Sequence, residues 1–109
     1  MLPKHQRLIK YRIEHVLDKG RKKVNYFFIL KYLPTKHHTS RFCVMTSLKV
    51  SPKAVVRNRI RRQIYEIFRL NPKLPAVPFD LVLIARSSIT KLSFAELTKA
   101  LLTTLQTLQ

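Results

Sequence analysis

The alternation of apolar and polar positions along the chain predicts helices first. Residues 53–69 contain no Gly or Pro, and a proline precedes the segment and another follows it. The apolar positions recur at spacings of four, four and three, which places them on about one quarter of a helix circumference. We therefore predict a helix over residues 53–69 with one side in a core. The apolar stripe consists of Val56, Ile60, Ile64 and Ile67, widened by Phe68.

Two further segments have helical spacing. The first, residues 10–19, is followed by Gly20 at the position of a C-terminal cap. Near the C-terminus, Ser93 and Glu96 have the spacing of a capping box and predict the start of a closing helix. The apolar positions of the first segment are Ile9, Ile13, Val16 and Leu17. Those of the closing helix are Phe94, Leu97, Leu101, Leu105 and Leu108.

Three other segments predict strands. Residues 26–33 are rich in aromatic and aliphatic side chains and predict a mostly buried strand, with Phe28 and Leu30 on one side and Ile29 on the other. Residues 41–50 predict a second long strand. Residues 79–86 form a continuous apolar run, which is typical of a strand buried on both faces.

The order of these elements is helix, strands, helix, strand, helix. It predicts one α/β domain over residues 1–109, with helices packed on a single sheet. The strand, helix and strand across residues 41–86 form a crossover unit. If its strands are parallel, general experience predicts a right-handed connection.

Composition adds a strong positive charge to this outline. The chain has 22 Lys and Arg against 5 Asp and Glu, a formal net charge of +17, which favours nucleic acid as a partner. No apolar run approaches the roughly 18 residues of a membrane-spanning helix, and the N-terminus lacks the apolar core of a secretion signal. Cys43 is the single cysteine and is interpreted as a buried, inert thiol. These features predict a cytoplasmic protein.

Arginine is concentrated in the predicted helix over residues 53–69. Arg57 and Arg61 are like charges one turn apart, a pair that costs a few tenths of a kcal/mol in an isolated helix. Arg59 and Arg62 lie within the same six residues, and Glu66 is the one acid of the segment. The missing anions are therefore expected on a partner, and guanidinium groups match phosphate well. The alternative is a solvated charged face, which the basic character of the whole chain disfavours.

The chain offers no set of residues for catalysis or metal binding by the protein itself. Glu14 and Asp18 are interpreted as salt-bridge partners, and Asp80 as a turn residue that opens a strand. The adjacent His37 and His38 are interpreted as surface imidazoles on a loop. One glycine excludes a glycine-rich phosphate loop, and no DNA-binding motif is present. RNA is the favoured partner, because a basic helix can hold phosphates while sheet aromatics stack on bases.

The segment Lys53-Ala-Val-Val-Arg-Asn-Arg-Ile-Arg-Arg resembles the Arg-Asn-Arg signature of the bacterial ribonuclease P protein subunit. The resemblance extends to Arg7-Leu8, to Val16-Leu17 before Gly20, to residues 80–86 and to residues 92–97. It implies an αβββαβα fold that is ribosomal protein S5 domain 2-like. This fold has a four-stranded sheet, a short first strand near residues 22–25 and an unusual left-handed βαβ crossover.

The resemblance also implies a function. The protein would assist a catalytic RNA that removes the 5′ leader from precursor tRNA, with Mg²⁺ bound by that RNA and its substrate. The signature helix and the turn before it would bind the catalytic RNA through Lys49, Lys53, Arg57, Asn58, Arg59, Arg61, Arg62 and Arg69. A cleft between the first helix and the sheet would hold the leader through Ile13, Leu17, Phe28, Lys31 and Tyr32. The family's aromatic cleft positions on the first helix hold Ile13 and Leu17 here, and a frequent arginine position holds Tyr65.

Two alternatives remain at the level of the sequence. One is a structural RNA-binding protein, such as a small ribosomal component, and the weaker one is a protein nuclease. Neither a membrane nor a protein partner is implied.

Overall fold

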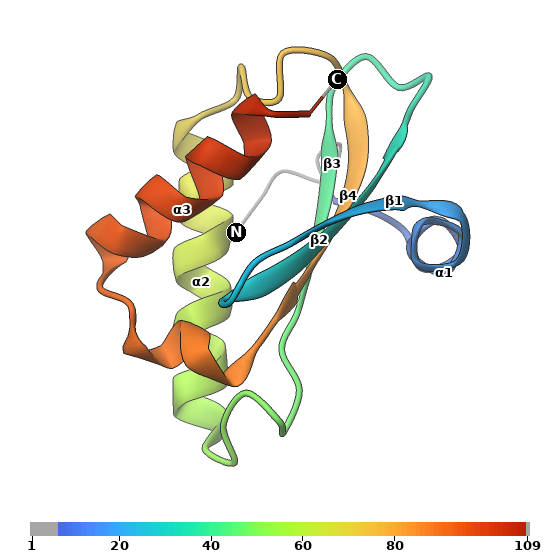
Figure 1. Ribbon diagram of the computed structural model, residues 1–109. Helices are drawn as coiled ribbons and strands as arrows, with labels where there is room; N and C mark the ends of the chain where they lie inside the picture. The colour runs from blue at the N-terminus through green and yellow to red at the C-terminus, as the bar shows by residue number, and fades with distance from the viewer. Residues whose placement is uncertain (1–6, 109) are drawn as a thin grey trace.

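The computed structural model describes residues 7–108, which form a four-stranded sheet with helices on both of its faces (Figure 1). One helix lies on one face, and the two others lie on the opposite face. The strands are β1 (Arg21–Val24), β2 (Phe28–Pro34), β3 (Arg41–Met45) and β4 (Phe79–Ala85). The helices are α1 (Lys10–Lys19), α2 (Ala54–Leu70) and α3 (Phe94–Gln106), with a 3₁₀ turn, η2 (Ser87–Lys91), before α3.

The sheet has the strand order β1-β2-β4-β3, in which β2 is antiparallel to both of its neighbours and β3 is parallel to β4. Helix α2 therefore connects two adjacent parallel strands. Seen from the helix side with both strands pointing up, β4 lies to the left of β3, so the crossover is left-handed (Figure 1). The general expectation of a right-handed crossover is wrong here, and the arrangement implied by the family resemblance is confirmed. The short first strand implied near residues 22–25 is β1.

The main core lies between the sheet and helices α2 and α3. The apolar stripe of α2 enters it as predicted, and the rings of Phe68 and Phe42 stack with centroids 3.8 Å apart. Helix α3 contributes Leu97, Leu101 and Leu105. Its predicted capping box is present, because the Ser93 side chain accepts from the backbone of Glu96 and Glu96 accepts from the backbone of Ser93.

A second, smaller cluster lies under α1, where Val16 contacts Leu8 and Val82. Strand β4 is therefore buried on both faces, as its continuous apolar run predicts. Gly20 ends α1, but its φ of −69° is extended and not left-handed. A side chain at Gly20 would clash with the carbonyl oxygen of Val16, so glycine is needed here for close approach rather than for an unusual backbone angle.

Two strand boundaries differ from the predictions. Strand β3 ends at Met45, because the chain turns over residues 48–50, where Val50 is buried and Leu48 is exposed. Strand β2 begins only at Phe28, because the Asn25 side chain accepts hydrogen bonds from two backbone N–H groups and forms a turn. None of the helices in the described part of the chain is long and apolar enough to cross a membrane.

Candidate RNA interface

The solvent side of α2 carries a row of arginines, and neutral acceptors hold two of them in place. Arg57 Nη1 donates to the carbonyl oxygen of Ser51 at 2.9 Å. Arg61 Nη2 donates to Thr46 Oγ1 at 2.7 Å, and Arg61 Nη1 donates to Asn58 Oδ1 at 3.2 Å. These bonds orient the guanidinium groups toward the loop between β3 and α2 and leave their charges uncompensated.

Within residues 7–108, no carboxylate pairs with the arginines at positions 57, 59, 61 or 62. The ion pairs among residues 7–108 join Asp80 to Arg12 and Arg41, Asp18 to Lys19, and Glu66 to Arg69. Arg69 thus differs from the other predicted RNA-binding residues, because its guanidinium donates to Glu66, and this hydrogen bond lowers the pKa of that carboxyl group. The excess positive charge is concentrated on the N-terminal half of α2.

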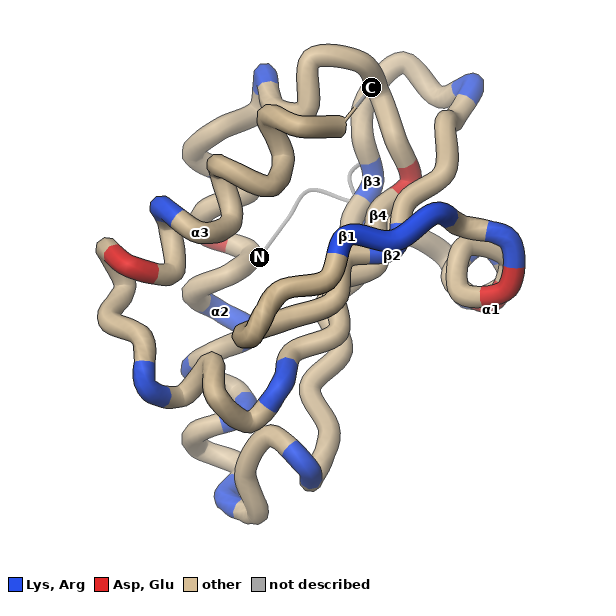
Figure 2. The backbone as a smooth tube through the Cα atoms, in the orientation of Figure 1, with Lys and Arg blue, Asp and Glu red and all other residues tan. Residues whose placement is uncertain are grey.

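The remaining predicted RNA-binding residues lie around the same end of the molecule. Asn58, Arg59 and Arg62 are exposed on α2, and Lys49 and Lys53 are exposed in the turn before it. Figure 2 shows lysine and arginine gathered on this loop and on the first turns of the helix. The structure therefore brings these positions together on one surface, and their contact with RNA stays a prediction.

Tyr65 lies on the flank of α2 that faces the edge strand β3. Its hydroxyl accepts a hydrogen bond from the backbone N–H of Val44 at 3.1 Å, and burial raises the pKa of the Tyr65 hydroxyl. An edge strand has backbone groups without a strand partner, and this bond satisfies one of them. Tyr65 therefore helps to attach α2 to the sheet.

We expect Tyr65→Phe to lower the free energy of unfolding by about 1–2 kcal/mol, because the N–H of Val44, a buried residue, loses its acceptor. Urea unfolding followed by circular dichroism measures this change. Tyr26→Phe is the control, since the Tyr26 side chain is 66% exposed and its hydroxyl makes no hydrogen bond within residues 7–108. Equal stability of the two variants would contradict the role of the Tyr65 hydroxyl.

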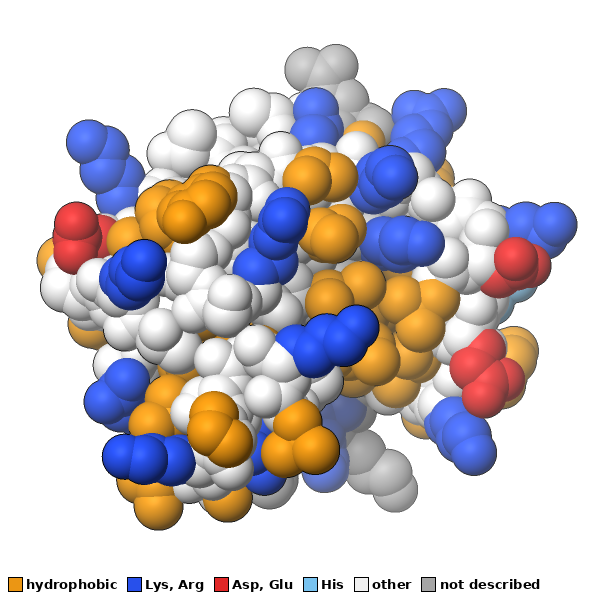
Figure 3. Space-filling model, turned by 60° about the horizontal axis from the view of Figure 1, so that its bottom comes forward, with side chains coloured by type: hydrophobic (Ala, Val, Ile, Leu, Met, Phe, Trp, Pro, Cys, Tyr) orange, Lys and Arg blue, Asp and Glu red, His pale blue; other side chains and the backbone are white. Residues whose placement is uncertain are grey.

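A second surface lies beside α1, where this helix leaves part of the sheet uncovered. Ile13 and Leu17 are partly buried on one flank of α1, together with Cys43 and Ile84 of the sheet. Lys31 Nζ donates to the carbonyl oxygen of Leu17 at 2.6 Å and joins β2 to the end of the helix. Figure 3 shows a hydrophobic area between the sheet and α1, with lysine and arginine side chains around it. Three of the five predicted cleft residues, Ile13, Leu17 and Lys31, thus lie together.

Phe28 and Tyr32 do not belong to this surface, and the prediction that they line the cleft is wrong. Phe28 is fully buried in the main core on the opposite face of the sheet. Tyr32 is 7% exposed on the same opposite face, with its ring 5.5 Å from that of Phe79. Successive strand residues point to opposite faces, so a strand that presents Lys31 to α1 must turn these two aromatics away from it.

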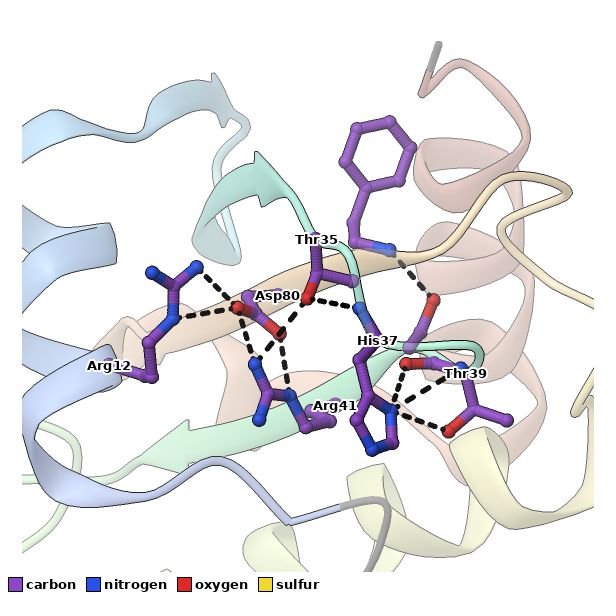
Figure 4. A network of polar contacts seen from close by, with 8 residues as sticks. Arg12, Thr35, His37, Thr39, Arg41 and Asp80 are labelled. Carbon is purple, nitrogen blue, oxygen red and sulfur yellow. Dashed lines mark hydrogen bonds and ion pairs between the residues drawn. The ribbon is translucent and has the colours of Figure 1, made fainter.

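Asp80 holds α1 on the sheet, and its predicted role in a turn is wrong. The side chain is fully buried within β4 and accepts from Arg12 Nε at 3.0 Å and from Arg12 Nη2 at 2.6 Å (Figure 4). Arg41 Nε and Nη2 donate to the two oxygens of the same carboxylate at 2.9 and 3.0 Å. Arg12 lies 68 residues away in sequence and Arg41 39, so no local pattern reveals the trio. An acid inside an otherwise apolar run was the one available signal, because a buried carboxylate needs a cation.

The remaining candidate chemical groups are inert or structural. Cys43 is half-buried, and burial raises the pKa of its thiol, which keeps it protonated and unreactive at neutral pH. The rings of His37 and His38 stack with centroids 4.6 Å apart, and His37 Nδ1 bonds to Thr39. Over residues 7–108, no three His, Cys, Asp or Glu side chains lie close enough together to hold a metal ion.

Known proteins share both the sequence and the fold. The family model of Ribonuclease P matches residues 2–109. The ribonuclease P protein components of Petrotoga mobilis and Clostridioides difficile are 34% and 36% identical to the chain. The alignments cover 81% and 79% of the chain, and 75% of each relative. The solved ribonuclease P protein of Thermotoga maritima superposes with a TM-score of 0.85 at 26% identity, over 94% of this chain and 97% of that one.

Proposed function

Because the chain belongs to the ribonuclease P protein family, we propose that the basic surface at the start of α2 binds the catalytic RNA of ribonuclease P. The protein is a component of a tRNA-processing ribonucleoprotein and has an RNA partner. The proposal assigns this contact to Lys49, Lys53, Asn58 and to the arginines at positions 57, 59, 61 and 62. Arg69 contributes less, because Glu66 already offsets its charge.

The surface beside α1 that Ile13, Leu17 and Lys31 form is the predicted cleft, and it receives the 5′ leader of precursor tRNA. The side of the cleft that α1 forms is apolar at Ile13 and Leu17. Strand β2 adds no exposed aromatic side chain, since Phe28 and Tyr32 lie in the core. The leader is therefore held by apolar contact and by nearby cations rather than by stacking on the sheet. Arg61 bonds Thr46 just beyond the end of β3, the strand that also carries Cys43 of the surface beside α1, so we propose that the two surfaces are continuous. One RNA–protein interface spans both.

The RNA carries out the hydrolysis, with Mg²⁺ bound by that RNA and by the substrate. The protein offsets the repulsion between two polyanions and keeps the leader in register. The process takes place in the cytoplasm. The observation that supports this assignment best is the arginine-rich start of α2, where Arg57 and Arg61 donate to neutral acceptors and no arginine from position 57 to 62 pairs with a carboxylate of the described residues.

A cleavage assay tests the proposal. The cognate RNA subunit is incubated with precursor tRNA at low Mg²⁺, with and without the chain, and mature tRNA is measured. We expect the chain to stimulate cleavage strongly at low Mg²⁺ and weakly at high Mg²⁺, because its cations replace part of the screening that the metal provides.

Two controls separate the alternatives. The chain alone is incubated with precursor tRNA, and cleavage in that sample would instead support a protein nuclease. Absence of stimulation at every Mg²⁺ concentration, with RNA binding intact, would instead favour a purely structural RNA-binding protein. The family relationship does not favour a purely structural RNA-binding protein.

A further inference from the structure

Helix α1 has two flanks, and the cleft described above uses only one of them. Tyr11 and His15 are one turn apart, and Ile13 and Leu17 lie about 200° around the helix from them. Between the two flanks, Arg12 and Val16 face the sheet. The flank of Tyr11 and His15 therefore borders a separate part of the molecule, where β2 ends and the loop to β3 begins.

An open pocket of about 570 Å³ lies on that flank. A cavity of this size is within the range of small-ligand sites, which is roughly 300–1,000 Å³. Its polar lining comes from three parts of the chain, namely α1, the loop after β2 and the first residue of β3. The lining residues that bear on its chemistry are Tyr11, Arg12, His15, Lys36, His37 and Arg41.

The pocket is positively charged, and two of its three cations are held in place. Arg12, Lys36 and Arg41 contribute three positive charges against the single negative charge of Asp80, which leaves an excess of two. Asp80 engages Nε and Nη2 of both arginines (Figure 4). Within residues 7–108, no hydrogen bond uses Nη1 of either arginine. A buried carboxylate thus fixes two guanidinium groups that each keep donors for an anion.

The rim of the pocket carries an aromatic side chain that nothing else explains. Tyr11 is 66% exposed on α1, so its ring does not serve the core. Exposed aromatic rings beside a basic groove are the usual means by which proteins hold unpaired bases. A phosphodiester carries one negative charge, which the excess positive charge of the pocket accommodates.

We propose that this pocket binds one nucleotide of a single-stranded RNA segment, with its phosphate at Arg12, Arg41 and Lys36 and its base against Tyr11. The site is separate from the α2 surface and from the cleft on the other flank of α1. It rests on the RNA partner of the family and not on the assignment of either of those two surfaces.

The experiment is an NMR titration of the ¹⁵N-labelled full chain with an unstructured RNA of ten nucleotides. The reporters are the backbone amides of Thr35, Lys36 and His37, which belong to the pocket; their loop lies at the opposite end of the sheet from the start of α2 (Figure 1). Saturable shifts of these amides are expected. Tyr11→Ala should weaken the apparent affinity at these reporters by about fivefold or more, because a stacked base is lost. Tyr26→Ala removes a ring of equal exposure from the turn between β1 and β2 and should leave the affinity unchanged.

Two further measurements distinguish binding of a nucleotide from binding of a simple anion. Lys36→Gln should reduce the salt dependence measured at the reporters by about 0.7 in log–log slope, while Lys73→Gln, an exposed lysine of the loop after α2, should not. Inorganic phosphate should shift the same amides with much lower affinity than RNA. Equal affinity for phosphate and RNA, together with no effect of Tyr11→Ala, would overturn the nucleotide site in favour of a simple anion pocket.

The last arm separates this proposal from the assignment of the α2 surface. Arg59→Ala combined with Arg62→Ala should leave the shifts of the pocket amides in place, even where total RNA affinity falls. Loss of these shifts in that variant, or their absence in the unmodified chain, would overturn the pocket as an RNA site. Failure of the α2 variant to weaken total RNA binding would count against the α2 assignment and leave the pocket supported.

Discussion

Replacing Arg57, Arg61 and Arg62 together with alanine is expected to weaken binding to the ribonuclease P RNA by about tenfold or more at low salt and to reduce the salt dependence of binding. Each lost phosphate contact is expected to lower the slope of log K against log salt concentration by about 0.7–0.9, so three lost contacts lower it by about 2–3. Filter binding or fluorescence anisotropy over a series of salt concentrations measures both quantities.

The expected size of this effect follows from how the three side chains are held. Arg57 and Arg61 donate to a backbone carbonyl, a hydroxyl and an amide oxygen, all of them neutral acceptors. Arg62 is exposed and makes no ion pair within residues 7–108. Their charges are therefore available to phosphate, and removal of these side chains breaks no intramolecular ion pair. The variant is expected to remain folded, which circular dichroism checks.

A matched control removes the same number of charges elsewhere. Lys73, Lys91 and Lys99 are all exposed and lie in the loop after α2, in η2 and on α3. Their combined replacement with alanine should change the slope much less than the arginine variant does. Equal slopes for the two triple variants would show that net charge, and not the α2 surface, determines binding.

The helices of this fold could be predicted from the sequence because their apolar stripes are local. The predicted segments over residues 10–19 and 53–69 agree with α1 and α2 to within one residue at each end. The ends of the strands are harder to predict. Residues 46–50 continue the apolar pattern of β3, but Val50 enters the core from a turn and not from the sheet. A short apolar segment indicates burial, but it does not distinguish a strand from a turn whose apolar side chain packs in the core.

The candidate site could be predicted only in part, and the reasons are physical. The density of arginine identified the α2 surface, because charge is visible in sequence. Alternation along β2 separates Lys31 from Phe28 and Tyr32, but the sequence does not tell which of these two sides meets α1, because both lie in an apolar context. Phe28 and Tyr32 were therefore assigned to the wrong face of the sheet. The pocket beside Tyr11 combines segments that are distant in sequence and has no local signal.

Asp80→Ala is expected to cost about 3–5 kcal/mol of unfolding free energy, the largest stability effect of any single change considered for this chain. The carboxylate is fully buried and accepts from two guanidinium groups whose side chains are only 21% and 19% exposed. Its removal leaves two like charges facing each other in a partly desolvated site. Domains of this size have about 5–15 kcal/mol of stability, so this loss is a large fraction of the total. Urea unfolding of the variant measures it.

A control and a rescue separate the buried ion pairs from a general effect of charge. Glu66→Gln breaks the exposed pair with Arg69 and should leave stability unchanged within error. Asp80→Leu combined with Arg12→Met and Arg41→Met removes the trio without leaving a charge behind and should recover most of the lost stability, because apolar replacement of a buried ion network is often neutral. The same triple variant should lose RNA-dependent shifts of the pocket amides, since both fixed guanidinium groups are gone. Stability as low as that of Asp80→Ala in the triple variant would contradict the electrostatic account and would instead assign the loss to the packing of α1 on β4.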